Sequence, residues 1–165
     1  MKKSLLILSL ILVISIIFCF NIKKSDNNNS KEKFAIYLID KNINSEEMKK
    51  NMNDLQLEKF PIITDENIIS YDWDNHIIKL SNKFDIPESI RGSRNRNCVV
   101  MIGDERIYIG VFHSPLSSMK LSTEFPVLRV YEEDSCNILA INNNGIDIND
   151  IRIHEFFRKE HKLKK

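Results

Sequence analysis

Hydrophobic and polar positions divide the chain into three regions. Residues Ser4–Ile22 are nineteen uncharged residues between two pairs of lysines, and their few polar positions form no stripe. As a helix they span about 28 Å, close to the hydrocarbon thickness of a bilayer. We therefore expect a hydrophobic membrane helix at residues 1–22. Residues 23–33 lack the apolar side chains that would offset the entropy of ordering, so we expect a flexible linker before a folded domain at residues 34–165.

The hydrophobic segment is compatible with three outcomes: an uncleaved signal anchor, a lipoprotein lipidated on Cys19, and a cleaved secretory peptide. Phe18 stands before Cys19, where a lipoprotein normally has a small residue, and the flanking positions offer signal peptidase no small residue either. The N-terminal flank is very short, which is the form of a signal sequence. Each outcome therefore predicts that the domain lies on the extracytoplasmic side of the cell membrane.

Within the domain, short hydrophobic runs alternate with polar turns. Phe34–Asp40 has the length and the branched and aromatic residues typical of a strand. Asn44-Ser45, followed by two glutamates, favours the start of a helix. Pro61 favours an extended stretch in the sequence FPIIT.

Two hairpins are predicted next. The first joins residues 68–73 to residues 76–80 around Asp74-Asn75, which tolerate left-handed turn geometry. Its expected pairs are Trp73 with His76, Tyr71 with Ile78, and Ile69 with Leu80. The second joins residues 98–102 to residues 106–112 around Gly103, with Val100, Ile107 and Ile109 expected on one face.

The remaining pattern completes an α+β domain. Strands are expected at residues 126–131 and 137–141, and a terminal helix at residues 151–162 with Asn149 or Asp150 as its cap. Strands paired as hairpins, with a few flanking helices, predict a mainly antiparallel sheet. The complete prediction is this α+β domain preceded by one N-terminal hydrophobic helix.

Charge and cysteine content narrow the possible functions. Residues 34–165 hold 18 Lys and Arg against 21 Asp and Glu, and the net charge is −7 before the basic tail that begins at Arg158. An acidic domain is a poor match for phosphate backbones, so we do not expect a nucleic-acid partner. Three cysteines are too few for a disulfide scaffold. Cys98 and Cys136 are nevertheless a candidate disulfide in an oxidising compartment, the alternative being two unbridged residues.

Motifs with established chemistry are missing from the sequence. It contains no Gly-rich phosphate loop, Cys-x-x-Cys pair, HExxH helix or G-x-S-x-G elbow, so we expect neither a catalytic residue, nor a metal, nor a cofactor. His154 and His161 are seven residues apart on the terminal helix and are predicted to lie on its solvated surface. Asp72, Asp74 and His76 would align as metal ligands only on a straight strand, and the predicted turn prevents this.

Several segments together resemble a known family. FAIYLID, PIIT, SYDW with the following His76, HIIKL, and ERIYIG with Gly110 are similar to an uncharacterised bacterial extracytoplasmic domain of lipoprotein type. Some members of that family are appended to membrane metallopeptidases similar to the beta-lactam sensor-transducers. The resemblance covers about residues 34–130 and implies no known reaction. His113 stands where members tend to have an aromatic residue, and the zinc motif of the metallopeptidases is absent.

A candidate ligand site lies around the long connection of residues 111–124. Arg106 and Tyr108 are expected on one strand face, because alternate residues of a strand point the same way. An arginine fork suits a carboxylate, and a tyrosine offers an apolar body with a polar tip. The other candidates are two aromatic side chains and three polar residues of the connection: Trp73, His76, His113, Ser117 and Ser118. The alternative is an ordinary polar loop in which Arg106 pairs with an acid such as Glu105 or Glu124, with Trp73 as a residue of the hydrophobic core.

These observations favour a membrane-tethered binding or sensing module over two alternatives. An anchor, a linker and a small acidic domain without a catalytic motif fit a module that binds a small molecule or an envelope protein. The first alternative is a structural or partner subunit of a cell-envelope complex. The second is an unrecognised hydrolase that uses His76 or His113 with Asp72 and the serines. Fold and anchoring alone do not decide among these classes.

Overall fold

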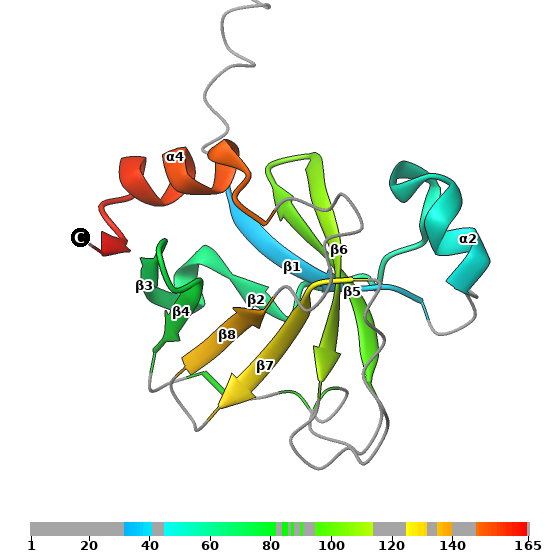
Figure 1. Ribbon diagram of the computed structural model, residues 1–165, viewed down its shortest axis with the longest axis horizontal. Helices are drawn as coiled ribbons and strands as arrows, with labels where there is room; N and C mark the ends of the chain where they lie inside the picture. Colours follow the sequence, from blue (N-terminus) through cyan, green and yellow to red (C-terminus); the bar gives the residue numbers. More distant parts are fainter. Residues whose placement is uncertain are drawn as a thin grey trace, which may run out of the picture. The chain divides into compact units, whose positions relative to one another are not determined.

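The strands form one mixed sheet that curls into a half-barrel (Figure 1). The computed structural model describes residues 32–40, 45–81, 84–85, 87, 90, 95–113, 125–131, 135–139 and 148–164. Within these residues the sheet has nine strands, and its architecture is mostly β with two short helices. In sheet order the strands are β2 (Ile63–Thr64), β1 (Phe34–Leu38), β5 (Arg96–Ile102), β6 (Glu105–His113), β7 (Val127–Tyr131), β8 (Ser135–Leu139), β4 (Ile77–Leu80), β3 (Ile68–Asp72) and β9 (Leu163–Lys164).

Most neighbouring strands are antiparallel, as the sequence predicts, but two pairs are parallel. β6 lies parallel to β7, and β3 lies parallel to the C-terminal strand β9. Parallel neighbours require a long connection, and hydrophobic alternation within a strand carries no information about such pairings. The predicted hairpins β3–β4, β5–β6 and β7–β8 are present. The parallel pairing of β6 with β7, which joins two of these hairpins, was not predicted.

The β3–β4 hairpin has the predicted strands with one change of register. Tyr71 pairs with Ile78 as expected, but an irregularity between Ile68 and Ser70 places Ile68 opposite Leu80. Ile69, which was expected to pair with Leu80, has 49% of its surface exposed. The bulge turns Ile69 outward because an extra residue in one strand reverses the alternation of faces.

A second irregularity moves Ile109 off the predicted face of the β5–β6 hairpin, while Val100 and Ile107 belong to one cluster as expected. Gly103 occupies the turn with a φ of +57°, the left-handed conformation that favours glycine. Val100 pairs with Tyr108, whereas Met101 pairs with Arg106, so a bulge lies between Val100 and Met101. The prediction that Ile109 shares a face with Val100 is wrong, because Ile109 belongs to the opposite side of the sheet.

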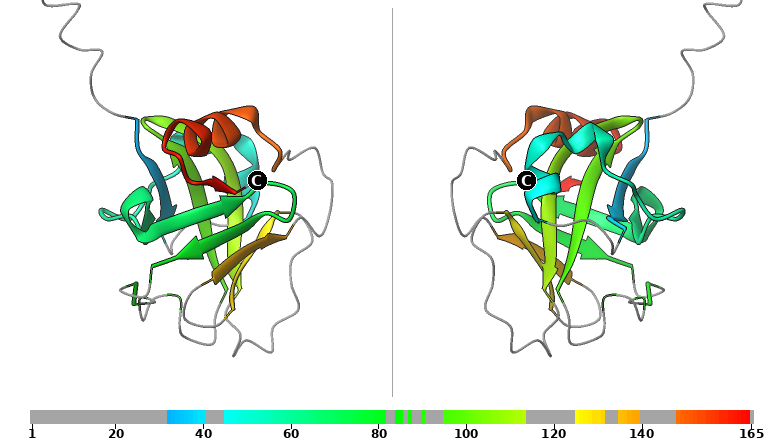
Figure 2. Two further views of the ribbon diagram at one scale, coloured as in Figure 1. Left: turned by 90° about the vertical axis from the view of Figure 1, so that its left-hand side faces the viewer. Right: turned by 90° about the vertical axis from the view of Figure 1, so that its right-hand side faces the viewer.

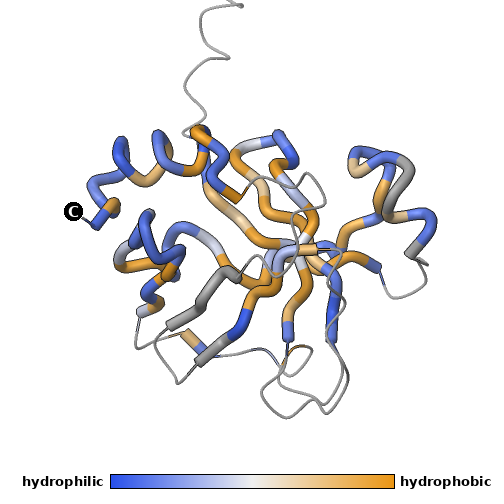
Figure 3. The backbone as a smooth tube through the Cα atoms, viewed as in Figure 1, coloured by the Kyte–Doolittle hydropathy of each residue, from blue (hydrophilic) through white to orange (hydrophobic). Residues whose placement is uncertain are grey.

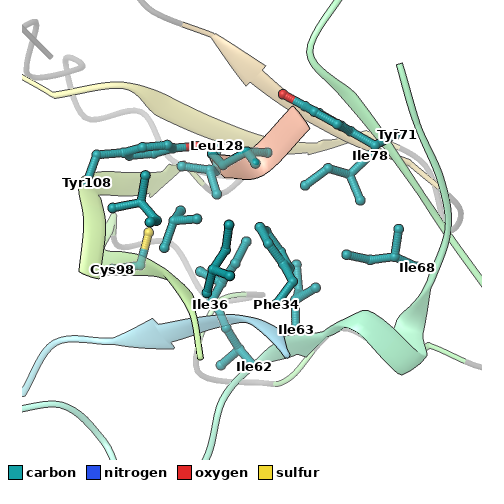
Figure 4. Close-up of a cluster of buried hydrophobic side chains, with 14 of the residues drawn as sticks. Phe34, Ile36, Ile62, Ile63, Ile68, Tyr71, Ile78, Cys98, Tyr108 and Leu128 are labelled. Atoms are coloured by element: carbon teal, nitrogen blue, oxygen red, sulfur yellow. The ribbon is translucent and has the colours of Figure 1, made fainter. Parts of the chain in front are cut away.

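Both faces of the central strands are buried. The larger cluster contains Cys98, Val100 and Tyr108 together with residues of β3, β4 and α4 (Ile151–Lys159). Figure 4 shows Cys98 and Tyr108 at one end of this cluster and Tyr71 and Ile68 at the other. The smaller cluster contains Val99, Ile109 and Val111 and is covered by residues of α2 (Ser45–Lys50) and of the following 3-10 turn η2 (Met52–Asp54). Two-sided burial explains the near-continuous apolar runs CVVMI and IYIGVF.

Helix α4 crosses one end of the half-barrel, as both views of Figure 2 show. Its N-cap is Asp150, one of the two predicted caps, whose side chain accepts a hydrogen bond from the Arg152 backbone N–H. Figure 3 shows hydrophobic and hydrophilic positions alternating along the helix, and the buried ones are Ile153, Phe156 and Phe157.

The terminal helix ends earlier than the predicted residue 162. The backbone N–H groups of His161 and Lys162 donate to the carbonyls of Arg158 and Phe157, and His161 has a φ of +55°. This is a Schellman ending with a histidine in the position that usually holds glycine. It releases the chain to form β9 beside β3.

The described part of the chain contains no helix that is long and apolar enough to cross a membrane. The hydrophobic segment of residues 4–22, on which the membrane prediction depends, lies outside the described residues. Glu32–Lys165 form one compact unit.

Candidate functional site

Four ring-bearing side chains meet where the β3–β4 turn contacts α4. We refer to Tyr71, Trp73, His76 and His154 as the Trp73 cluster. The Trp73 ring contacts both imidazoles, with its centroid 5.8 Å from that of His76 and 5.0 Å from that of His154, both edge-on. Tyr71 lies beneath them, 6.2 Å from Trp73, and is itself packed on Phe157 at 4.8 Å. Tyr71 is buried, while the other three members are partly exposed.

His76 is held in an unusual backbone conformation with its ring fixed by a hydrogen bond. Its φ is +53°, and its Nδ1 lies 2.9 Å from the Tyr71 hydroxyl. Burial, and to a smaller extent the negative charge of Asp72, raise the pKa of Tyr71 well above its ordinary value. The hydroxyl therefore stays protonated and forms a hydrogen bond with Nδ1 of His76.

His154 completes the cluster from the C-terminal helix. Its side chain is 28% exposed, and its Nδ1 lies 3.4 Å from a carboxylate oxygen of Glu155. Glu155 also accepts hydrogen bonds from Arg158, and these bonds hold the pKa of Glu155 below its usual range. The predicted solvated surface holds only in part for His154, which also packs on Trp73, whereas His161 is exposed just after the helix.

The carboxylate next to the cluster, Asp72, is hydrogen-bonded within the β3–β4 turn. Asp72 accepts hydrogen bonds from the backbone and side chain of Asn75, which lower the pKa of Asp72, and it lies 3.8 Å from Lys164 Nζ. Because Asp72 is bound to Asn75 and the Nδ1 of His76 is bound to Tyr71, Asp72 does not orient His76 as a catalytic base. Among the described residues, no group of three or more metal-ligating side chains is placed to hold an ion.

Arg106 and Tyr108 do not share a face as expected. The Arg106 guanidinium donates to the backbone carbonyls of Met52 and Leu55, at 2.9 Å for Leu55, and so fastens η2 to the sheet. Tyr108 is buried in the larger core on the other side. The bulge in the β5–β6 hairpin separates the two residues, and Arg106 binds carbonyl groups in place of the expected acid or ligand.

His113 lies at the end of β6, beside an arginine that the sequence analysis did not consider. Parallel pairing makes Arg129 of β7 its register partner, and its Nδ1 lies 2.8 Å from Asn95 Oδ1. Burial and the charge of Arg129 lower the pKa of His113. In the sheet order, β7 and β8 stand between the β5–β6 and β3–β4 hairpins, so His113 is not a neighbour of Trp73 and His76 within the sheet.

Five further candidates either fall outside the described residues or lie on strands that are not neighbours. Cys19, Ser117 and Ser118 lie outside the described residues. Cys98 is buried in β5, and the backbone of Cys136 lies in β8. Two strands separate β5 from β8, which implies about 14 Å at the usual strand spacing, twice the reach of a disulfide. This sheet order does not fit the predicted bridge.

No protein-family model, curated protein or solved structure matches this chain. The resemblance to an extracytoplasmic domain family therefore stays an expectation. A functional assignment depends on the sequence and on the geometry of the Trp73 cluster.

Proposed function

We propose that the chain is a membrane-tethered binding or sensing module, with its domain on the extracytoplasmic side and the Trp73 cluster as its ligand site. The hydrophobic segment at residues 4–22 and the polar linker after it support the tether. The resemblance to an extracytoplasmic domain family supports the same compartment. The finer description of the fold, an α+β domain preceded by a hydrophobic helix, is part of this proposal.

The contact of Trp73 with both His76 and His154 is the observation that carries the proposal. Trp73 is the single tryptophan of the chain, and it is only partly buried although it packs on the main core. A residue with positive φ, other than glycine, asparagine or aspartate, costs about 1–2 kcal/mol in the left-handed region. At His76 this strain is offset by the contacts of the ring, which is hydrogen-bonded to Tyr71 and packs on Trp73. Strained residues of this kind concentrate at binding sites.

The cluster fits a small molecule that has one flat apolar face and polar substituents. An exposed tryptophan surface supplies apolar contact at low entropic cost, and imidazole nitrogens supply directed hydrogen bonds. Asp72 and Lys164 place one negative and one positive charge near the same turn.

Intrinsic fluorescence tests the site directly, since Trp73 is the only tryptophan. The full chain in zwitterionic micelles is titrated with cell-wall fragments, short peptides and antibiotics. A ligand of the cluster changes the Trp73 emission, and His154→Gln weakens that response at least several-fold. The matched control is His161→Gln, because His161 lies just beyond the C-terminal end of the same helix and is exposed and outside the cluster. A response that is equal in both variants moves the site elsewhere.

Protease accessibility tests the compartment independently. Protease added to intact protoplasts is expected to remove residues 34–165 while the cells stay sealed. Protection of the domain under these conditions overturns the orientation.

A partner subunit of an envelope complex is the second candidate. Phe60, Ile69 and Ile151 are large apolar side chains that are 70%, 49% and 63% exposed. Single exposed apolar residues are common on monomers, so this observation is weaker than the cluster. A stable co-purifying envelope protein that is lost on changing Phe60 to serine, with no ligand response at Trp73, would favour this candidate.

A further inference from the structure

The carboxylate of Asp72 places a negative charge at the Trp73 cluster. Asp72 ends β3 and directly precedes Trp73. Burial and, to a smaller extent, the charge of Asp72 raise the pKa of Tyr71, so this carboxylate is close enough to act on the cluster. Hydrogen bonds from the side chain and backbone of Asn75 hold the pKa of Asp72 below its ordinary value. Asp72 is therefore ionised at neutral pH.

One oxygen of this carboxylate has a cation nearby that does not bind it closely. Oδ1 accepts hydrogen bonds from the backbone and side chain of Asn75, and the same side chain reaches Oδ2 at 3.1 Å. Lys164 Nζ lies 3.8 Å from Oδ2, which is beyond hydrogen-bond distance. Because a carboxylate oxygen can accept more than one hydrogen bond, Oδ2 retains capacity for an ammonium donor that lies closer than Lys164 does.

A second negative charge comes from α4. A carboxylate oxygen of Glu155 lies 3.4 Å from Nδ1 of His154, whose ring packs on Trp73. Hydrogen bonds from Arg158 hold the pKa of Glu155 below its usual range, so Glu155 is also ionised at neutral pH. Tryptophan is the aromatic side chain that attracts cations most strongly to its ring face. A partly exposed tryptophan with two ionised carboxylates favours a cationic ligand group.

The cations that accompany these two acids offset their charge only in part. In each pair the acid is less exposed than its cation: 19% against 64% for Asp72 and Lys164, and 40% against 58% for Glu155 and Arg158. Solvent screens an exposed charge more than a partly buried one. The negative charges therefore dominate close to the rings.

We propose that the ligand of the Trp73 cluster is an amine in its ammonium form, bound through Asp72 and the Trp73 ring. This inference rests on the proposed function, because it names the chemical class of the ligand at the same site. Lys164 is an ammonium of the chain itself near the same carboxylate, and the ligand takes its place at hydrogen-bond distance from Oδ2. The flat apolar part of the ligand lies on Trp73.

Three probes that differ mainly in charge test this preference. Benzylammonium, benzyl alcohol and benzoate share one flat ring and carry a cationic, a neutral and an anionic group. Each is titrated against the full chain in uncharged maltoside micelles, which contain no ammonium group, and binding is followed by the emission of Trp73, the single tryptophan. We expect benzylammonium to bind more tightly than benzyl alcohol by about tenfold, and benzoate to bind most weakly.

An aspartate variant and its control assign the preference to Asp72. Asp72→Asn removes the charge but keeps an oxygen that accepts from the Asn75 backbone, so the affinity for benzylammonium is expected to fall to that for benzyl alcohol. Asp54→Asn is the matched control. Asp54 is an exposed acid that also accepts a hydrogen bond from an asparagine three residues away, and it belongs to η2, outside the Trp73 cluster. We expect no change in this control.

A lysine variant tests the competing ammonium. Lys164→Gln removes it and is expected to tighten benzylammonium binding by about two- to fivefold. Its control is Lys159→Gln, because Lys159 is similarly exposed but pairs with Glu32.

Failure of this inference is distinguishable from failure of the proposed function. If benzyl alcohol or benzoate binds as tightly as benzylammonium, or if Asp72→Asn retains the preference, the ligand is not an ammonium although the Trp73 cluster is a binding site. Absence of any response to benzylammonium also overturns the inference. The proposed function fails only if the cell-wall fragments, peptides and antibiotics give no response either.

Discussion

The two histidines with positive φ, His76 and His161, are expected to respond oppositely to replacement by glycine. Both have nearly the same backbone conformation, with φ of +53° and +55°. They differ in their side chains. The His76 ring is bound to Tyr71 and lies against Trp73, whereas His161 is exposed at the end of α4. The comparison separates the stabilisation that the His76 ring contributes from the strain of the His76 backbone.

The backbone contribution is common to both positions. The left-handed conformation costs a residue with a Cβ about 1–2 kcal/mol, and glycine gives back about 0.5–1 kcal/mol through its greater freedom in the unfolded chain. His161→Gly therefore stabilises the domain by about 0.5–1 kcal/mol. His76→Gly has the same gain but loses a hydrogen bond of about 1 kcal/mol and ring contacts of about 0.5–1.5 kcal/mol. Its net effect is a destabilisation of about 1 kcal/mol, which places the two variants about 2 kcal/mol apart.

Urea denaturation followed by far-UV circular dichroism measures this difference without relying on Trp73. With an m-value of about 2 kcal/mol/M, the unfolding midpoints of the two variants differ by about 1 M, with the unmodified chain between them. An equal gain in stability for both variants would show that the His76 ring does not stabilise the folded domain. A loss for His161→Gly would contradict the Schellman ending of α4.

Three further predictions concern the core and its ionisation. Gly110→Ala is expected to cost about 1–3 kcal/mol in urea denaturation, because the new Cβ would lie 2.5 Å from Cδ1 of the fully buried Leu128; full stability would contradict the packing of β6 on β7. Arg106→Met is expected to cost about 1.5–3 kcal/mol through its lost bonds to backbone carbonyls, with the Trp73 ligand response unchanged; a lost response in a stable variant would return Arg106 to the ligand site. The raised pKa of Tyr71 means that the unfolded chain releases this proton first, so stability falls as the pH rises through 10; Tyr71→Phe is expected to flatten that decline, and an unchanged decline would refute the role of burial.

Of the four residues in the Trp73 cluster, the sequence predicted Trp73 and His76 as site residues. It did not predict that Tyr71 and His154 belong to the same site. Trp73 and His76 stood out as an aromatic and an imidazole beside a short turn. Tyr71 was predicted correctly as the partner of Ile78, but nothing local showed that its hydroxyl binds His76. His154 lies on a helix far along the chain, and only the packing of α4 across the half-barrel brings it to Trp73. Contacts of this kind depend on tertiary structure and leave no trace in the local pattern.

The same distinction between local and distant contacts applies to the sheet. Local rules located the hairpins, the Asp150 cap and the glycine turn at Gly103, because each depends on a few adjacent residues. The bulges in both hairpins broke the strict alternation on which the predicted faces depended, and this separated Arg106 from Tyr108. The parallel pairing that sets Arg129 beside His113 joins residues on either side of a long connection. For this reason the local pattern gave no indication that Arg129 is the register partner of His113.

The central claim is that the Trp73 cluster binds a ligand, and the emission of Trp73 tests it most directly. Cell-wall fragments, short peptides and antibiotics are added in turn to the full chain and to the His76→Gly and His154→Gln variants, each shown to be folded by circular dichroism. We predict that at least one class shifts the emission of the unmodified chain in a saturable way and that both variants weaken this response at least several-fold. No saturable shift with any class, or a shift that both variants retain at the size seen in the unmodified chain, contradicts the claim.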